Sequence, residues 1–304
     1  MSGTLTGPAL AASDDPGPDG GTRRRRRSGA GGVNRRPGFL VYGLLLAVIL
    51  GSAFPLYWSF LIGSYDATVV NKDLPPIWPG GHFFENAARV FDAVPFWVAL
   101  ANSVFVSTVV ACSVTFFSTL AGYAFAKLRF RGRTGAMVFI VATMAVPMQL
   151  GVIPLFIVMS RLGMTDSLWS VIVPGLVNAF GVFFMRQYLV DASPDELIEA
   201  ARVDGCSMIR IFWHVALPAA RPAAAILWLF TFMATWTDFF WPLIVLPADK
   251  PTVQLALQQL QSGYYVDYSL VLAGVTLASL PLLVLFVLAG RHLVSGIMQG
   301  AVKG

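Results

Sequence analysis

Charged residues are scarce in this chain. Aspartate, glutamate, lysine and arginine together make up 12% of the 304 residues, whereas hydrophobic residues make up 56%. A soluble domain of similar size has about a quarter of its residues charged. The composition therefore excludes an ordinary soluble domain and predicts a membrane protein.

Residues that serve catalysis or metal binding are scarce as well. The two cysteines, Cys112 and Cys206, lack the spacing of a zinc site, and a disulfide between them is not expected. The three histidines are scattered along the chain. No GxxxxGK[ST] run occurs, so the chain cannot cradle a nucleotide phosphate, and no nucleophile lies near a base in a catalytic pattern. We therefore expect no enzyme activity, no metal and no cofactor bound by this chain itself.

Long apolar segments are what the sequence has in abundance. Each of six segments has about 20 or more residues, enough for an α-helix to cross the roughly 30 Å hydrocarbon layer. Short segments of alternating polarity, typical of membrane β-barrels, are absent. The sequence predicts an all-α membrane protein with six transmembrane helices, at residues 38–62, 97–126, 135–159, 168–190, 222–246 and 268–290. Pro147 and Pro154 are expected to kink the third span.

The distribution of basic residues predicts the orientation. With six spans both ends of the chain share one side, and seventeen of the 21 lysine and arginine residues fall on that side. The positive-inside rule places it in the cytoplasm. This topology explains the net positive charge without nucleic acid as a partner. Residues 1–37, which include the run Arg23–Arg27, predict a disordered basic cytoplasmic tail, and residues 63–96 a loop or short-helix connection outside.

A polar island interrupts the apolar sequence on the predicted cytoplasmic side. Ser193, Pro194 and Glu196 predict a capping box, followed by a helix of about eleven residues that stops at Gly205. Ser207 is expected to cap a second short helix. That helix is expected to end at Leu217–Pro218, because proline disfavours a helical conformation in the residue before it.

The second short helix carries an apolar stripe. The stripe consists of apolar residues at helical spacing, namely Met208, Ile211, Phe212 and Val215. An apolar face of this kind outside the bilayer is expected to pack against another surface. The cover predicted here is another protein. The alternative is that the helix lies flat on the membrane or packs on the chain's own spans.

The island resembles a known family motif. Glu199-Ala200-Ala201, then Gly205, Val215 and Leu217-Pro218 at fixed spacing resemble the EAA motif of ABC importer permeases, with valine where the family usually has isoleucine. The resemblance implies a type I ABC importer permease fold over residues 38–304, with a cytoplasmic coupling loop at about 191–221. The residues that it assigns to docking on the ATPase are Glu199, Ala200, Ala201, Asp204, Gly205, Val215, Leu217 and Pro218.

Further segments are similar to the carbohydrate branch of this family, the maltose type. They are Asn102-Ser103, Ala121–Lys127, Phe130–Arg133, Trp236–Phe239 and the ending Gly300–Gly304. The resemblance covers nearly the whole chain after residue 38. It implies a sugar importer in the plasma membrane of a prokaryote, with membrane lipid around it. The implied partners are a second homologous permease, a cytoplasmic ABC ATPase dimer that binds the ATP, and an extracytoplasmic sugar-binding protein.

Four polar residues within the spans are candidates for the translocation path: Asp238, Asn102, Gln149 and Asn178. Polar groups at this depth are costly, so each needs a function or a partner. Asp238 either faces the path or lies toward the outer end of its span, where it pairs with Thr235 or Thr237 or caps a helix break near Pro242. The three amides either line the path or join helices by hydrogen bonds.

Two other functions compete with a sugar importer. The first is an ABC importer for another solute, such as glycerol phosphate, because related permeases share the EAA loop. The second is a self-contained secondary transporter, which would be expected to show inverted repeats and intramembrane acidic residues for ion coupling. Neither feature is apparent in the sequence.

Overall fold

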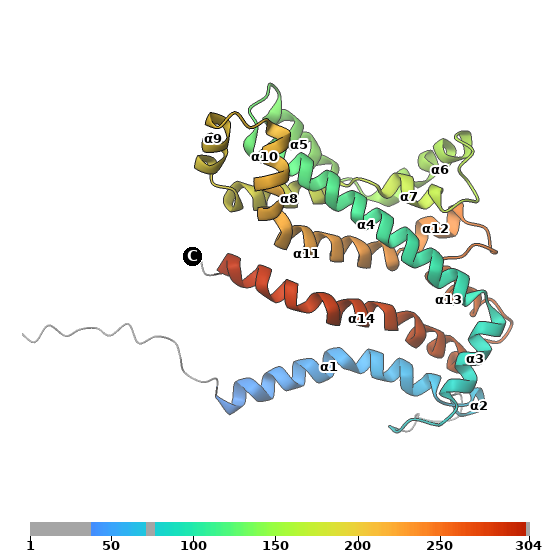
Figure 1. Ribbon diagram of the computed structural model, residues 1–304. Coiled ribbons are helices and arrows are strands. Elements are labelled where there is room, and N and C mark those ends of the chain that lie inside the picture. Colours follow the sequence, from blue (N-terminus) through green and yellow to red (C-terminus); the bar gives the residue numbers. More distant parts are fainter. Residues whose placement is uncertain (1–37, 71–76, 302–304) are drawn as a thin grey trace, which may run out of the picture. The chain divides into compact units, whose positions relative to one another are not determined.

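The computed structural model describes residues 38–70 and 77–301, so the predicted tail at 1–37 lies outside the described residues. Contacts divide the chain into two units, Met1–Leu50 and Gly51–Gly304. All regular elements in the described residues are helical (Figure 1). They are α1 (Phe39–Gly63), α2 (Ala67–Val70), α3 (Phe83–Ala93), α4 (Phe96–Lys127), α5 (Arg133–Thr143), η1 (Met148–Gly151), α6 (Val152–Arg161), α7 (Trp169–Gly175), α8 (Ala179–Ala192), α9 (Asp195–Val203), α10 (Met208–Ile211), η2 (Phe212–Ala216), α11 (Leu217–Trp236), α12 (Phe240–Val245), α13 (Val253–Gln259) and α14 (Tyr268–Ala301).

The spanning helices match most of the predicted segments. Five stretches in the described residues are long and apolar enough to cross a membrane, and a bent pair makes a sixth if it counts as one span. The five are α1, α4, α7 with α8, the run α10–η2–α11, and α14 to Gly290. The prediction of an all-α membrane protein is confirmed.

The third span is broken more sharply than predicted. α5 and the following helix, Met148–Arg161, meet at 91°. Pro147 lies at the break with an extended ψ of 127°. Pro154 instead lies in the first turn of α6, where its missing N–H costs no hydrogen bond, so it makes no second kink.

The fifth span begins earlier than predicted. α10 does not end at Leu217–Pro218 but runs through a π-helical turn, η2, into α11. The N–H of Leu217 donates to the carbonyl of Phe212, five residues back. The wider π turn accommodates the proline ring, which would clash in a regular α-helix, and the helix therefore continues.

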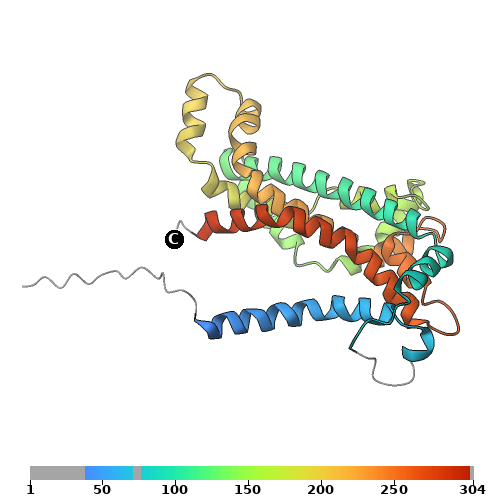
Figure 2. The ribbon, with the colours of Figure 1, turned by 60° about the horizontal axis from the view of Figure 1, so that its bottom comes forward.

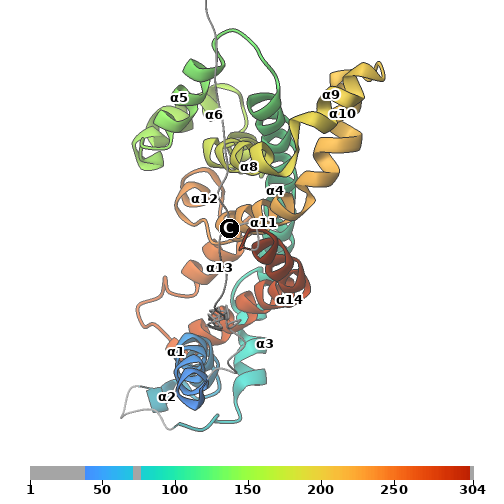
Figure 3. The ribbon, with the colours of Figure 1, turned by 90° about the vertical axis from the view of Figure 1, so that its left-hand side faces the viewer.

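Two cores lie along α4, which packs on α8 and α11. One core joins α4, α8 and α11 to α9 and α10. The other joins α4 to α3, α11, α13 and α14. Figures 1 and 2 show α9, α10 and the final turns of α14 at one end of these helices, with α3 and α13 at the other. The hairpin of α9 and α10 projects to one side of the neighbouring helices (Figure 3).

Candidate coupling site and translocation path

The hairpin begins without the predicted capping box. α9 starts at Asp195, its N-cap position is Pro194, and no side chain caps it. The hydroxyl of Ser193 is buried and has no hydrogen-bond partner among the described residues. The helix has nine residues rather than about eleven, because it starts after the proline and not at the serine. The prediction of Ser193 as the cap was wrong.

The glycine stop at the end of α9 is confirmed. Gly205 has φ = +76°, a left-handed conformation that suits glycine. The N–H of Cys206 donates to the carbonyl of Ala201 at 2.9 Å, and the N–H of Gly205 donates to that of Arg202 at 3.0 Å. This is a Schellman closure, and it satisfies carbonyls at the end of the helix. Ser207 then caps α10, as predicted, by accepting from the N–H of Arg210 at 3.3 Å.

The apolar stripe of the second helix is covered by the chain itself. Ile211 and Phe212 are buried, and Met208 and Val215 are half-buried against the same core. The ring of Tyr123 on α4 lies 5.6 Å from that of Phe212. The expectation that another protein covers this stripe was wrong, and the alternative, packing on the chain's own spans, is correct. Leu217 and Pro218 are half-buried in the same helix and are not at an exposed surface.

The exposed side of the hairpin is a different surface, which we call the α9 face. It combines apolar and acidic side chains with two small residues, and it consists of Leu197, Glu199, Ala200, Val203, Asp204, Gly205 and Ile209. Val203 is 88% and Ile209 73% exposed. Ile198 is buried on the opposite side of α9, and Ala201 is half-buried there. Five of the eight predicted docking residues lie in or beside the α9 face, whereas Val215, Leu217 and Pro218 are half-buried outside it.

Lys127, the last residue of α4, contacts the start of the hairpin. Its ammonium group donates to Asp195 Oδ1 at 2.8 Å and to the carbonyl of Val190, near the end of α8, at 3.0 Å. The side chain of Lys127 is 5% exposed, whereas that of Asp195 is 77% exposed. The hydrogen bond and the charge of Lys127 lower the pKa of Asp195 below its usual value. The contact of Lys127 with the hairpin was not predicted from the sequence. The available signal was its position at the end of the Ala121–Lys127 segment.

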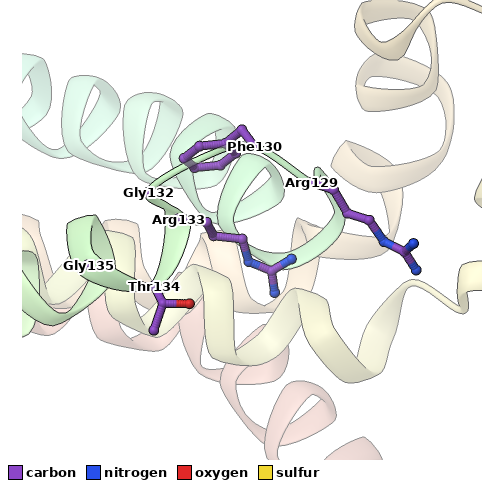
Figure 4. A pocket seen from close by; sticks show the side chains of 6 residues that line it. All are labelled: Arg129, Phe130, Gly132, Arg133, Thr134 and Gly135. Carbon is purple, nitrogen blue, oxygen red and sulfur yellow. The ribbon is translucent and has the colours of Figure 1, made fainter.

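A basic loop follows α4. Figure 4 shows a hollow lined by Arg129, Phe130, Gly132, Arg133, Thr134 and Gly135. Arg133 donates to the carbonyl of Leu128 at 3.2 Å, and the charges of Arg129 and Arg133 also favour the ionised form of Asp195. This loop therefore adds positive charge near the Lys127–Asp195 pair.

Three of the four candidate path residues lie where a helix is broken. Asn178 separates α7 from α8 and caps α8, because its side chain accepts from the N–H of Gly181 at 2.6 Å. Asp238 lies between α11 and α12, and its carboxylate lies near the backbone N–H groups at the start of α12. Gln149 is exposed at the bend between α5 and α6. These positions favour capping for Asn178 and Asp238.

The fourth candidate, Asn102, lies on α4 away from these breaks. Its amide donates to the carbonyl of Pro251 at 2.9 Å, and the neighbouring hydroxyl of Ser103 accepts from the N–H of Val253 at 2.8 Å. The pair therefore fastens the segment before α13 to α4. A role of any of the four residues in the path stays a prediction.

Comparison with known proteins identifies the family. Residues 115–299 match the binding-protein-dependent transport system inner membrane component family. The chain is 34% identical over 222 residues to the arabinooligosaccharides transport system permease protein AraQ of Halalkalibacterium halodurans, covering 72% of this chain and 79% of that protein. It is 33% identical over 272 residues to the lactose transport system permease protein LacG of Rhizobium radiobacter, covering 88% and 97%.

Two further matches extend this picture. The sn-glycerol-3-phosphate transport system permease protein UgpE of Yersinia enterocolitica is 29% identical over 269 residues, with 86% of this chain and 94% of that protein covered. A chain from the crystal structure of a bacterial ABC transporter involved in the import of the acidic polysaccharide alginate matches with a TM-score of 0.70 and 25% identity, over 84% of this chain and 99% of that one. The named relatives are transport permeases, not enzymes, and the resemblance to ABC importer permeases is confirmed. The chain therefore belongs to the family of inner membrane components of binding-protein-dependent transport systems.

Proposed function

We propose that this chain is the transmembrane subunit of an ATP-driven importer that carries a sugar, and that residues 38–304 form half of the translocation path. The observation that carries the proposal is the exposed α9 face, which lies on a helical hairpin that projects beyond the neighbouring helices (Figure 2). An apolar and acidic surface of this kind supports docking of a protein, because apolar side chains outside the bilayer gain from being covered.

The proposed partners follow from this arrangement. A cytoplasmic ATPase dimer binds ATP and docks on the α9 face, a second homologous permease completes the path, and an extracytoplasmic binding protein delivers the solute. The orientation is the one that the basic residues predict, with both termini in the cytoplasm. The basic loop that follows α4 then faces the anionic headgroups of the inner leaflet.

An oligosaccharide is the proposed solute. Two relatives with at least 33% identity are named as permeases for arabinooligosaccharides and lactose. Glycerol phosphate is the second candidate, since UgpE is 29% identical. Uptake of labelled disaccharides and labelled glycerol phosphate into cells with and without the gene distinguishes the two: gene-dependent uptake of glycerol phosphate alone would reject the sugar.

Substitution of Gly205 tests the docking. In Gly205→Asp the chain should fold and insert, because a Cβ at this position meets no atom within 4 Å and aspartate tolerates the left-handed conformation. We expect loss of ATPase co-purification and of uptake, because a bulkier charged residue replaces glycine in the α9 face.

Gly163→Asp is the matched control for this test. Gly163 also follows a helix, has φ = +67° and an open Cβ position, and lies outside the α9 face. This variant should keep both ATPase co-purification and uptake. Unchanged ATPase binding in Gly205→Asp would contradict the proposed docking site.

A further inference from the structure

The last two turns of α4 contact both helices of the hairpin. Tyr123 and Lys127 are four residues apart and therefore lie on one face of α4. The hydroxyl of Tyr123 donates to the carbonyl of Met208, the first residue of α10, at 3.4 Å. Lys127 pairs with Asp195, the first residue of α9. α4 thus holds the beginning of each hairpin helix.

The same turns are also fixed to α8. A Cβ on Gly122 would lie 2.8 Å from the backbone nitrogen of Arg186, so the two helices approach closely at this glycine. Lys127 adds a hydrogen bond to the carbonyl of Val190, one of the last carbonyls of α8, which lack partners within the helix. A displacement of this end of α4 therefore also displaces α8.

Three helix ends meet at the ammonium group of Lys127. It lies at the C-terminal ends of α4 and α8, where the helix dipoles favour a cation. Asp195 lies in the first turn of α9, where the dipole favours an anion. The lysine side chain is almost fully buried, and these partners compensate its charge. The buried lysine side chain thus fixes the position of the ammonium group, although its partner Asp195 is exposed.

We propose that Lys127 is a positioning residue that transmits the movement of α9 to the α4–α8 pair. This inference rests on the proposed function, because it assumes that an ATPase moves the hairpin. When α9 is displaced, Asp195 pulls on the ammonium group, and α4 and α8 follow together. Without the pair, α9 remains joined to the spans through Ser193–Pro194 and the burial of Ile198.

Asp195→Asn is the central test variant, because the side chain is exposed and its loss does not open the core. Asp191→Asn is the matched control: it removes an exposed carboxylate one turn earlier, on α8. Lys127→Arg keeps the cation and should restore what Lys127→Met loses. All variants are compared in the full chain without Cys112 and Cys206.

The first measurement addresses the contact itself. Spin labels at Val203 and at Leu120, an exposed residue of α4, report the distance between the hairpin and the helix. We expect the distance distribution to broaden in Asp195→Asn and Lys127→Met, and to stay narrow in Asp191→Asn and Lys127→Arg. An unchanged distribution in Asp195→Asn would overturn the inference.

The second measurement addresses coupling in the assembled transporter in liposomes. Solute carried per ATP hydrolysed should fall about twofold to fivefold in Asp195→Asn, because asparagine keeps an acceptor for Lys127 but loses the charge of the ion pair. ATPase association should not change.

A broadened distance distribution with intact coupling would overturn the transmitting role and leave the proposed function standing. Failure of the wild-type chain to bind an ATPase would instead overturn the proposed function, while the distance measurement still tests the contact.

Discussion

At the scale of single residues, Gly122 decides how closely α4 and α8 approach. A Cβ at this position would lie 2.8 Å from the backbone nitrogen of Arg186 and equally close to the Cβ of Met185. Neither atom is the end of a flexible side chain, so the helices themselves must separate to admit it. The close approach is what brings Lys127 within reach of α8.

We therefore expect Gly122→Ala to destabilise the protein by about 1–3 kcal/mol, the range for overpacking, even though alanine favours the helix. The midpoint of thermal unfolding in detergent measures this. Gly135→Ala in α5 is the control, because its Cβ meets no atom within 4 Å. The free energy of unfolding of the control should equal that of the wild type or exceed it by up to about 1 kcal/mol. Equal stability of the two variants would contradict the close packing at Gly122.

Local rules predicted some residues and failed for others. Gly205 and Ser207 were predicted correctly because a helix stop and an N-cap depend on the backbone a few residues away. The cover of Phe212 was not predictable, because it comes from Tyr123, which is distant in sequence. The ion pair of Lys127 was not predictable for the same reason, because its partner Asp195 is 68 residues away in the sequence.

At the scale of helices, the breaks within the spans distinguish this fold from a simple bundle. α7 and α8 form one spanning stretch that is interrupted around Asn178. The interruption frees N–H groups at the start of α8, and the side chain of Asn178 accepts one of them. In the hydrocarbon layer such a group has no water to bond, so the cap is important.

Asn178→Ala should cost about 0.5–2 kcal/mol of stability, the usual range for a lost N-cap. Asn178→Ser, which retains an acceptor, should recover most of it. Thermal unfolding and the KM of uptake are measured for both variants. If Asn178 is only a cap, KM stays unchanged in both; a higher KM at wild-type stability would show instead that the side chain lines the path.

The helices were easier to predict than their joints. Each spanning segment contains about 20 apolar residues, and length alone identifies it. The effect of each proline on the helix was not predictable, because it depends on the surrounding structure. Pro147 lies at a 91° bend. Pro218 instead follows a π-helical turn in a helix that continues.

At the scale of the whole molecule, the orientation in the membrane is the property to test. Val203, in the α9 face, and Tyr264, in the loop between α13 and α14, are both highly exposed. In a chain free of other cysteines, Tyr264→Cys should react with a membrane-impermeant maleimide in intact cells. Val203→Cys should react only after permeabilisation. The reverse pattern would place the hairpin outside and contradict the proposed coupling.

The continuity of Met208–Trp236 has a mechanical consequence. These 29 residues stay helical throughout, although the helix changes direction around the π turn (Figure 1). No flexible linker therefore separates the hairpin from α11, and a displacement of Met208 must also move α11. The first residues at which this helix ends are Thr237–Phe239, beside Asp238. A stroke of the hairpin is therefore expected to change the geometry at this break.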